Sequence, residues 1–119
     1  MNKAHIAEPL VLVLPLRIVS EANKREHWRY RQRRSKACRS AAVAVPNGIA
    51  LPCAVHLTRI APRKLDDDNL QSGFKALRDG IADRLGIKDN DPRVTWSYDQ
   101  ERGKPHEYAA RITITRAWE

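Results

Sequence analysis

Three aspartates and an asparagine follow one another at residues 66–69, in a chain that is otherwise strongly cationic. In an extended segment, Asp66 and Asp68 would point the same way and Asp67 would point the other, so the outer two carboxylates could reach one cation. Mg²⁺ takes oxygen ligands and keeps several waters, so two or three carboxylates suffice to hold it. Alternatively, the acidic run caps a following helix through Asp68 or Asn69. Three acids in a row exceed what capping requires, which favours the metal site.

A second acidic pair, Asp89 and Asp91, lies further along the chain. To join Asp66 and Asp68, Asp91 would need its loop to fold back toward the start of the intervening helix. An Asx-type turn with Pro92 at its exit explains the same residues without a metal. From the residues alone, the turn is the favoured interpretation.

A single lysine has the spacing to assist those acids. Lys75 follows Asp68 by seven residues, about two helical turns, and is therefore expected on the same helix face. Its ammonium group could contact a scissile phosphate or stabilise charge in the transition state. An ion pair with Asp79, four residues later, explains the spacing equally well.

The positive charge is concentrated in one segment. The chain has 22 Lys and Arg against 14 Asp and Glu, and residues 24–39 hold eight cations against Glu26 alone. Such a segment is suited to a partner with many phosphates, although a solvated surface helix would show the same composition. The residues expected to contact DNA are Arg25, Arg29, Arg31, Arg33, Arg34, Lys36 and Arg39 in this segment, together with Arg63 and Lys64.

Other metal sites and a membrane location are not indicated. Cys38 and Cys53 stand fifteen positions apart, without the paired ligands of a zinc site. Free thiols in a reducing cytosol are favoured over a disulfide. The apolar run at residues 10–14 is broken by Pro15 and is far shorter than the roughly 20 residues of a membrane span. No signal peptide is read, and we expect a cytoplasmic protein.

The elements that must position these residues form one predicted domain over residues 1–119, with 1–8 as a loose terminus. Its best helical signal is an apolar stripe that Gly86 should end, namely Leu70, Phe74, Leu77, Ile81 and Leu85. The pattern predicts strands at 9–19, 52–61, 93–98 and 108–116, and helices at 22–45 and 70–85. This β-α-β-α-β-β order favours a two-layer α+β domain with a mixed sheet whose last two strands form a hairpin.

These acidic motifs make the chain resemble the RusA-type Holliday-junction resolvases, the crossover junction endodeoxyribonucleases. The resemblance is carried by Asp66-x-Asp68-Asn69 before a helix, Lys75 on that helix, and Asp91 in the loop before the next strand. It covers about residues 10–116. One departure is that Gln71-Ser72-Gly73 displaces the lysine to a later position.

The resemblance implies a RusA-like fold and a homodimer that nicks two opposed strands of a four-way DNA junction with Mg²⁺, for which Mn²⁺ could substitute. Asp66, Asp68 and Asp91 would hold the metal and Lys75 would assist with the developing charge. Two alternatives remain from the residues alone. One is a metal-dependent nuclease with looser specificity for branched DNA. The other is a non-catalytic basic DNA-binding protein whose acids only cap helices and form turns.

Overall fold

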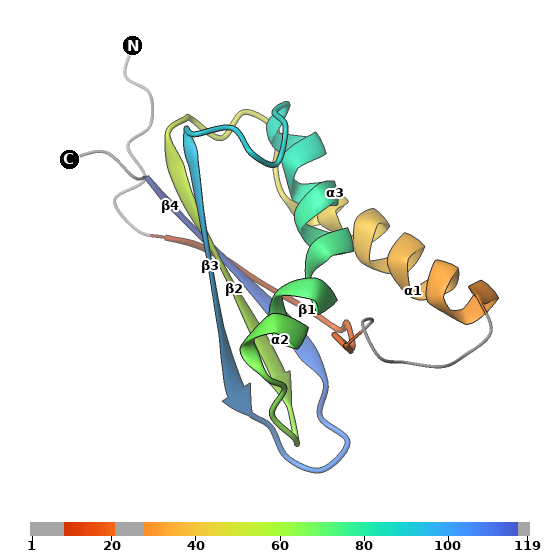
Figure 1. Cartoon of the computed structure of the whole chain (residues 1–119). Coiled ribbons are helices and arrows are strands. Elements are labelled where there is room, and N and C mark those ends of the chain that lie inside the picture. Colours follow the sequence, from red (N-terminus) through yellow and green to blue (C-terminus); the bar gives the residue numbers. More distant parts are fainter. Residues whose placement is uncertain (1–8, 21–27, 117–119) are drawn as a thin grey trace.

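The computed structural model describes residues 9–20 and 28–116. A mixed four-stranded sheet carries its helices on one face (Figure 1), which confirms the predicted α+β class. The elements in chain order are β1 (Leu10–Leu14), α1 (Trp28–Ala41), the 3₁₀ turn η1 (Ala42–Ala44), β2 (Cys53–Ala61), α2 (Asp67–Gly73), α3 (Lys75–Leu85), β3 (Val94–Arg102) and β4 (Ala109–Arg116). The expectations for the loose terminus, for the start of the first helix and for Arg25 lie outside the described residues.

The sheet order is β1-β4-β2-β3, with β4 antiparallel to both of its neighbours and β3 parallel to β2. The predicted hairpin between the last two strands is therefore wrong. Helices α2 and α3 carry the chain back along the sheet, so β3 starts beside the start of β2 and must run parallel to it. Strand β4 then passes to the other side of β2.

The core lies between the sheet and the helices. Alternate residues of β2 and β4 face the helices, and the predicted apolar stripe packs against them. The buried side chains of this layer include Val55, Leu57, Ile112, Ile114, Leu70, Phe74, Leu77 and Ile81. The stripe is thus confirmed as the core face of the helical segment.

That helical segment differs from the prediction in its limits. It begins at Asp67 with Asp66 as the N-cap residue, so capping by Asp68 or Asn69 is wrong. It is also divided at Phe74, where α2 ends and α3 begins. The glycine before the break is packed tightly, because a Cβ on Gly73 would lie 2.7 Å from the carbonyl oxygen of Val19. The far end is as predicted: the residue after α3, Gly86, has φ of 74°.

Helix α1 is attached to the rest of the protein by a small surface. Cys38 is its only buried residue, and the helix packs mainly against α3. The contact is closest at Gly80, where a Cβ would lie 2.6 Å from the Arg39 carbonyl oxygen and 2.8 Å from the Ala42 Cβ. Within the described chain, no helix is both long and apolar enough to cross a membrane.

This contact gives a first testable prediction. In an exposed helix, Gly→Ala stabilises by about 1 kcal/mol through propensity alone. Here the added methyl group would push α1 away from α3, and we expect Gly80→Ala to lower the free energy of unfolding by about 1–3 kcal/mol. Urea denaturation measures the change. Because propensity and packing predict opposite signs, a stabilised variant would show that the helices are not in contact at Gly80.

Candidate nucleic-acid interface

The three aspartates lie at the N-terminal end of α2, where the helix dipole favours negative charge. All three side chains are exposed. The carbonyl oxygen of Asp66 accepts the first helical hydrogen bond, from the Leu70 N–H at 2.8 Å, but its carboxylate makes no capping hydrogen bond. The Asp66 carboxylate is therefore not used to satisfy the helix end.

Asp67 and Asp68 are helical, so the expectation of an extended, alternating segment does not hold for them. Helical geometry separates them instead. Asp68 shares a face of α2 with Ser72, four residues later. Ser72 lines a cleft that is described below. Asp67 shares a face with the exposed Gln71. Asp68 and Asp67 are thus distinguished by helix face rather than by strand alternation.

Two residues that the sequence did not single out hold this loop in place. The Gln100 side chain binds both backbone groups of Leu65: its Nε2 donates to the Leu65 carbonyl at 2.7 Å, and its Oε1 accepts from the Leu65 N–H at 2.9 Å. Arg59 is 6% exposed and donates to the carbonyl oxygens of Ile18 and Arg63. Burial lowers the pKa of this guanidinium. Together the two side chains fix the backbone at Arg63 and Leu65, which leads directly into the acidic run.

Asp91 is not brought to Asp66 and Asp68. It precedes β3, whose first residue pairs with Cys53 at the start of β2, whereas Asp66 follows the end of β2. The loop before Asp66 is bound to Gln100, six residues into β3, so the two sites are separated by roughly 20 Å. Among the residues that the structure describes, no group of three or more His, Cys, Asp or Glu could hold a metal ion. The structure therefore places Asp91 apart from the other two predicted metal ligands.

Asp91 instead forms the turn that was the alternative interpretation. Its Oδ1 accepts the Arg93 N–H at 2.9 Å, and its Oδ2 accepts from Arg93 Nη2 at 2.8 Å. These hydrogen bonds from Arg93 lower the pKa of Asp91 to about 2. The neighbouring Asp89 also has a structural role, because its carbonyl oxygen accepts hydrogen bonds from Arg78 and Trp96.

The low pKa of Asp91 predicts a pH-dependent stability. A carboxyl group whose pKa is depressed in the folded state stabilises it above the unfolded pKa of about 3.8, and this contribution is lost as the pH falls toward about 2. The stability difference between the natural chain and Asp91→Asn should therefore be constant near neutral pH and shrink below about pH 4. Urea denaturation at several pH values measures it. A difference that does not change with pH would contradict the Asp91–Arg93 pairing.

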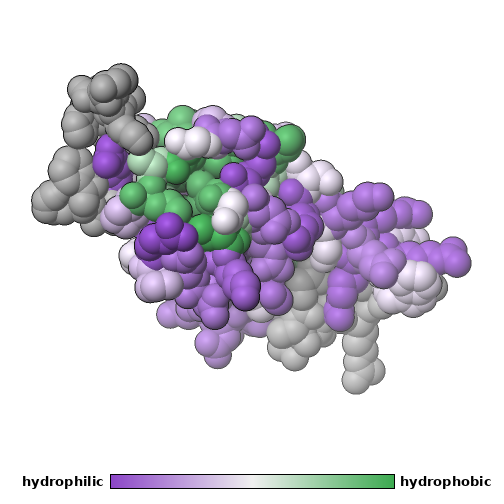
Figure 2. Space-filling model, turned by 90° about the horizontal axis from the view of Figure 1, so that it is seen from above, coloured by the Kyte–Doolittle hydropathy of each residue, from purple (hydrophilic) through white to green (hydrophobic). Residues whose placement is uncertain are grey.

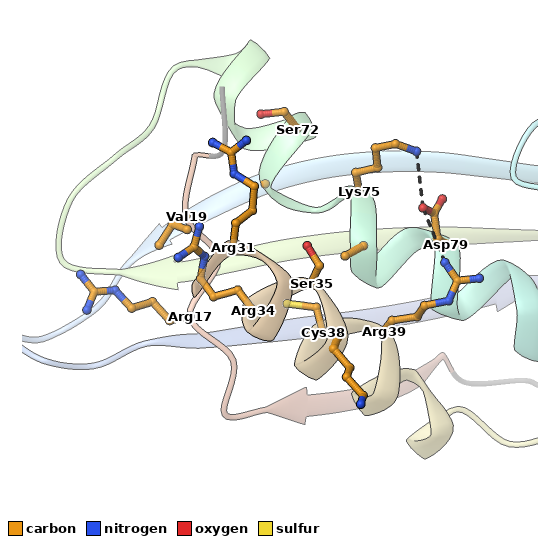
Figure 3. A pocket seen from close by; sticks show the side chains of 13 residues that line it. Arg17, Val19, Arg31, Arg34, Ser35, Cys38, Arg39, Ser72, Lys75 and Asp79 are labelled. Carbon is orange, nitrogen blue, oxygen red and sulfur yellow. Dashed lines mark hydrogen bonds and ion pairs between the residues drawn. The ribbon is translucent and has the colours of Figure 1, made fainter. Parts of the chain in front are cut away.

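The cationic segment borders a cleft of about 570 Å³, here called the first cleft, between α1 and the junction of α2 and α3 (Figure 3). Among the described residues, its cationic lining is Arg17, Arg31, Arg34, Lys36, Arg39 and Lys75, and its acidic lining is Asp79. Lys75 Nζ lies 3.4 Å from Asp79 Oδ2, and Arg39 Nη1 lies 3.9 Å from the same atom. Asp79 thus balances charge at one end of the cleft, whereas Arg31 and Arg34 lie toward the other.

The remaining predicted DNA contacts divide by helix face. Arg29 and Arg33 are not part of the first cleft; their guanidinium groups lie over the rings of Trp28 and Tyr30. Figure 2 shows mostly hydrophilic residues at the end of the molecule formed by α1. The predicted cations of α1 therefore include a cleft-lining set and an outward set.

A second cleft, of about 470 Å³, continues from the first and shares Arg17 and Val19 with it. The Arg17 guanidinium lies 4.2 Å from the centre of the Tyr108 ring, which also borders the second cleft. Arg63 and Asn69 line it too, and Lys64 is exposed beside Arg63. Because Asn69 follows Asp68 directly, the second cleft leads to the acidic end of α2.

The carboxylate oxygens at the N-terminal end of α2 could provide some of the ligands of a hard divalent cation. Asp66 and Asp68 supply exposed carboxylate oxygens, and the Asp66 carboxylate is not used in capping. Mg²⁺ is commonly bound by one or two carboxylates together with waters and substrate phosphates. Either carboxylate therefore suits a Mg²⁺ ion whose remaining ligands come from water and a bound phosphate, rather than from a closed protein site.

Arg17, Tyr108, Arg59 and Gln100 are the functional candidates that sequence reasoning missed. The sequence predicts Arg17 inside a strand over residues 9–19, but β1 ends at Leu14, before Pro15. The segment after it is therefore free to border both clefts. The early Pro15 was the one available signal for this.

Comparison with known proteins gives no function. No protein-family model matches the chain. A relative from Xylella fastidiosa (strain Temecula1 / ATCC 700964), described as "Uncharacterized protein", is 38% identical; the match covers 56% of this chain and 51% of the relative. The chain thus spans about half the length of the relative it matches.

Proposed function

We propose that the chain is a Mg²⁺-dependent endodeoxyribonuclease that acts on branched DNA, with the four-way junction as its substrate. The observation that carries this proposal is the position of α2. Its N-terminal end bears Asp66 and Asp68, and its last turn, at Ser72 and Gly73, forms one wall of the first cleft. A DNA strand held by the cationic clefts would therefore pass close to the two carboxylates.

The residues have distinct roles in this proposal. Asp66 and Asp68 hold Mg²⁺, which when bound supplies an activated water and neutralises charge on the phosphate. Arg17, Arg31 and Arg34 hold the phosphates of the strand. The Lys75 side chain is 72% exposed at the cleft wall. Because it is already paired with Asp79, it has a secondary role in offsetting the negative charge that develops on the phosphate.

Paired nicks on opposed strands require two equivalent sites, which a homodimer with two-fold symmetry supplies. A supporting observation is that Val11 and Val13 of β1 are 51% and 60% exposed. They lie on the sheet face opposite the helices, where burial against a second copy would stabilise a small domain. Light scattering at micromolar concentration should give a mass near twice 13.6 kDa. A mass near 13.6 kDa would exclude the homodimer.

A non-catalytic DNA-binding protein is the second candidate. It is favoured by the position of Asp91, which lies at the opposite end of the sheet from Asp66 and is bound to Arg93. In this case the clefts would still bind phosphates, and the acids of α2 would serve only its helix dipole.

One assay separates these functions. A synthetic four-way junction, a flap and a matched duplex, each labelled in turn on every strand, are incubated with and without Mg²⁺ and resolved on denaturing gels. We expect paired nicks placed symmetrically about the crossover, dependent on Mg²⁺ or Mn²⁺, with the duplex bound but seldom cut. Similar cleavage of the flap or duplex would indicate the looser nuclease, and binding without any cleavage would indicate the non-catalytic protein.

A further inference from the structure

The floor of the first cleft is apolar and recessed, and a protein that binds only the outside of a DNA duplex does not need such a surface. Small or apolar residues, Val19, Cys38, Gly73 and Ala76, line it between the cationic side chains. Cys38 is only 6% exposed, so this surface is recessed. Backbone phosphates of a duplex are contacted by exposed cations, polar side chains and backbone N–H groups, none of which needs an apolar recess. A recess of this composition instead suits a ligand with an apolar body and an anionic group.

The packing of α1 explains the recess. Helices α1 and α3 are in contact at Gly80, and α1 then diverges from α3 toward Trp28 (Figure 1). Between the described residues, the cleft is therefore closed at one end and open at the other. Its volume of about 570 Å³ lies in the range of sites that bind one small molecule. A nucleobase could enter it only after leaving the stack of a duplex.

The charges are arranged to hold such a base by its phosphates. At the closed end, Asp79 is paired with Lys75 and Arg39. At the open end, Arg31 and Arg34 point toward the cleft on the side of Arg17 (Figure 3). A nucleotide with its base inward and its phosphate at the open end would match this distribution.

The second cleft extends the same pattern. It begins at Arg17 and Val19, which it shares with the first, and contains the Tyr108 ring, over which the Arg17 guanidinium lies. It then passes Arg63 and reaches Asn69 at the acidic end of α2. A cationic track with an aromatic platform is how unpaired strands are bound without sequence readout.

We infer that the two clefts form a binding path for an unpaired DNA strand, with one base inserted into the first cleft and its neighbours passing over Arg17 and Tyr108. The inference rests on the proposed function, because it takes DNA as the ligand. It adds that the recognised part of the substrate is an unpaired nucleotide rather than duplex backbone.

The test uses the full chain in EDTA, so that binding is measured without cleavage. The probes are a fluorescein-labelled thymidine oligonucleotide, an abasic oligonucleotide of the same length, and a duplex of that length. Since the abasic strand keeps the phosphates and lacks the bases, it isolates base insertion. Fluorescence anisotropy should show the thymidine strand bound about tenfold or more tightly than the abasic strand.

The second part of the test uses a variant in which a larger side chain fills the first cleft. Ser35 on α1 lines the first cleft, and Ser35→Phe fills it without changing the charge. Ser40, on the same helix, is exposed and outside this cleft, so Ser40→Phe is the matched control. Ser35→Phe should reduce the preference for the thymidine strand by about threefold or more while leaving abasic-strand affinity within about twofold, because the bases over Arg17 and Tyr108 remain bound. Ser40→Phe should preserve the full preference.

Equal affinity of the natural chain for thymidine and abasic strands would overturn the inference, whether or not the Ser35→Phe variant folds. A preference that is not reduced at all in a folded Ser35→Phe variant would overturn it as well. In either case, cleavage of the junction by the natural chain would leave the proposed function standing. No affinity for any of the three probes or for the junction would overturn both.

Discussion

Replacing Asp68 by Asn is expected to reduce Mg²⁺-dependent cleavage of a four-way junction by at least about 100-fold while leaving junction binding unchanged or tighter. The substitution removes the charge of a proposed metal ligand, so the attacking water is no longer activated. It also removes a negative charge beside the path of the phosphates, which by itself favours DNA binding. Cleavage and affinity should therefore change in different directions.

The controls for this prediction come from helix geometry. Asp67→Asn makes the same chemical change one residue earlier, on the face of α2 shared with Gln71 rather than Ser72. It should alter cleavage by less than about tenfold. Asp91→Asn, at the other end of the sheet, should leave cleavage unchanged.

Single-turnover cleavage on a denaturing gel and anisotropy in EDTA measure the two effects separately. Loss of an acid at the first turn of a helix costs only about 0.3–1 kcal/mol, so the variants should stay folded. Equal losses of cleavage from Asp67→Asn and Asp68→Asn would show that the acids act through their summed charge. A loss from Asp91→Asn as large as that from Asp68→Asn would show that Asp91 belongs to the active site after all.

Much of the fold was predictable because it depends on local pattern. The stripe from Leu70 to Ile81 and the alternation of Ala110, Ile112 and Ile114 identify the surfaces that form the core. Gly86 ends α3 because the left-handed conformation there is accessible to glycine. In these cases the periodicity of the side chains determines which face is buried.

The order of the strands was not predictable from such patterns, because alternation shows which face of a strand is buried and not which strand lies beside it. The segment from Cys53 to Arg102 is a strand, a helical crossover and a strand, and such units favour a parallel pair. Predicting a hairpin for β3 and β4 overlooked this preference. The error also affected the site, since a parallel crossover places Asp91 and Asp66 at opposite ends of the sheet.

The positioning residues left no signal in the sequence. Arg59 occupies a core-facing position of β2, where an aliphatic residue is the usual choice, and its burial depends on carbonyl oxygens from the segments at residues 18 and 63. Gln100 lies in the part of β3 that extends beyond the predicted strand. Both roles depend on contacts between distant segments, which only the tertiary structure brings together.

The outward and cleft-lining arginines of α1 allow the DNA-binding surface to be tested at constant charge. Arg31 and Arg34 line the first cleft, whereas Arg29 and Arg33 lie over aromatic rings outside its lining. We expect the double substitution of Arg31 and Arg34 by Gln to weaken junction binding by about 10- to 100-fold at low salt, because two phosphate contacts are lost. The same substitutions at Arg29 and Arg33 should weaken junction binding by about threefold or less, because they lower only the overall positive potential of the protein.

The salt dependence of the binding constant distinguishes the loss of phosphate contacts from a general loss of positive potential. Each phosphate contact contributes about 0.9 to the slope of log K against log salt, so the Arg31 and Arg34 variant should have a slope shallower by nearly two units. The Arg29 and Arg33 variant, with the same net charge, should keep a slope close to that of the natural chain. Anisotropy titrations of an EDTA-treated junction at several salt concentrations give both values. Equal changes in the two variants would mean that α1 acts by its total charge, and that the first cleft is not where the phosphates bind.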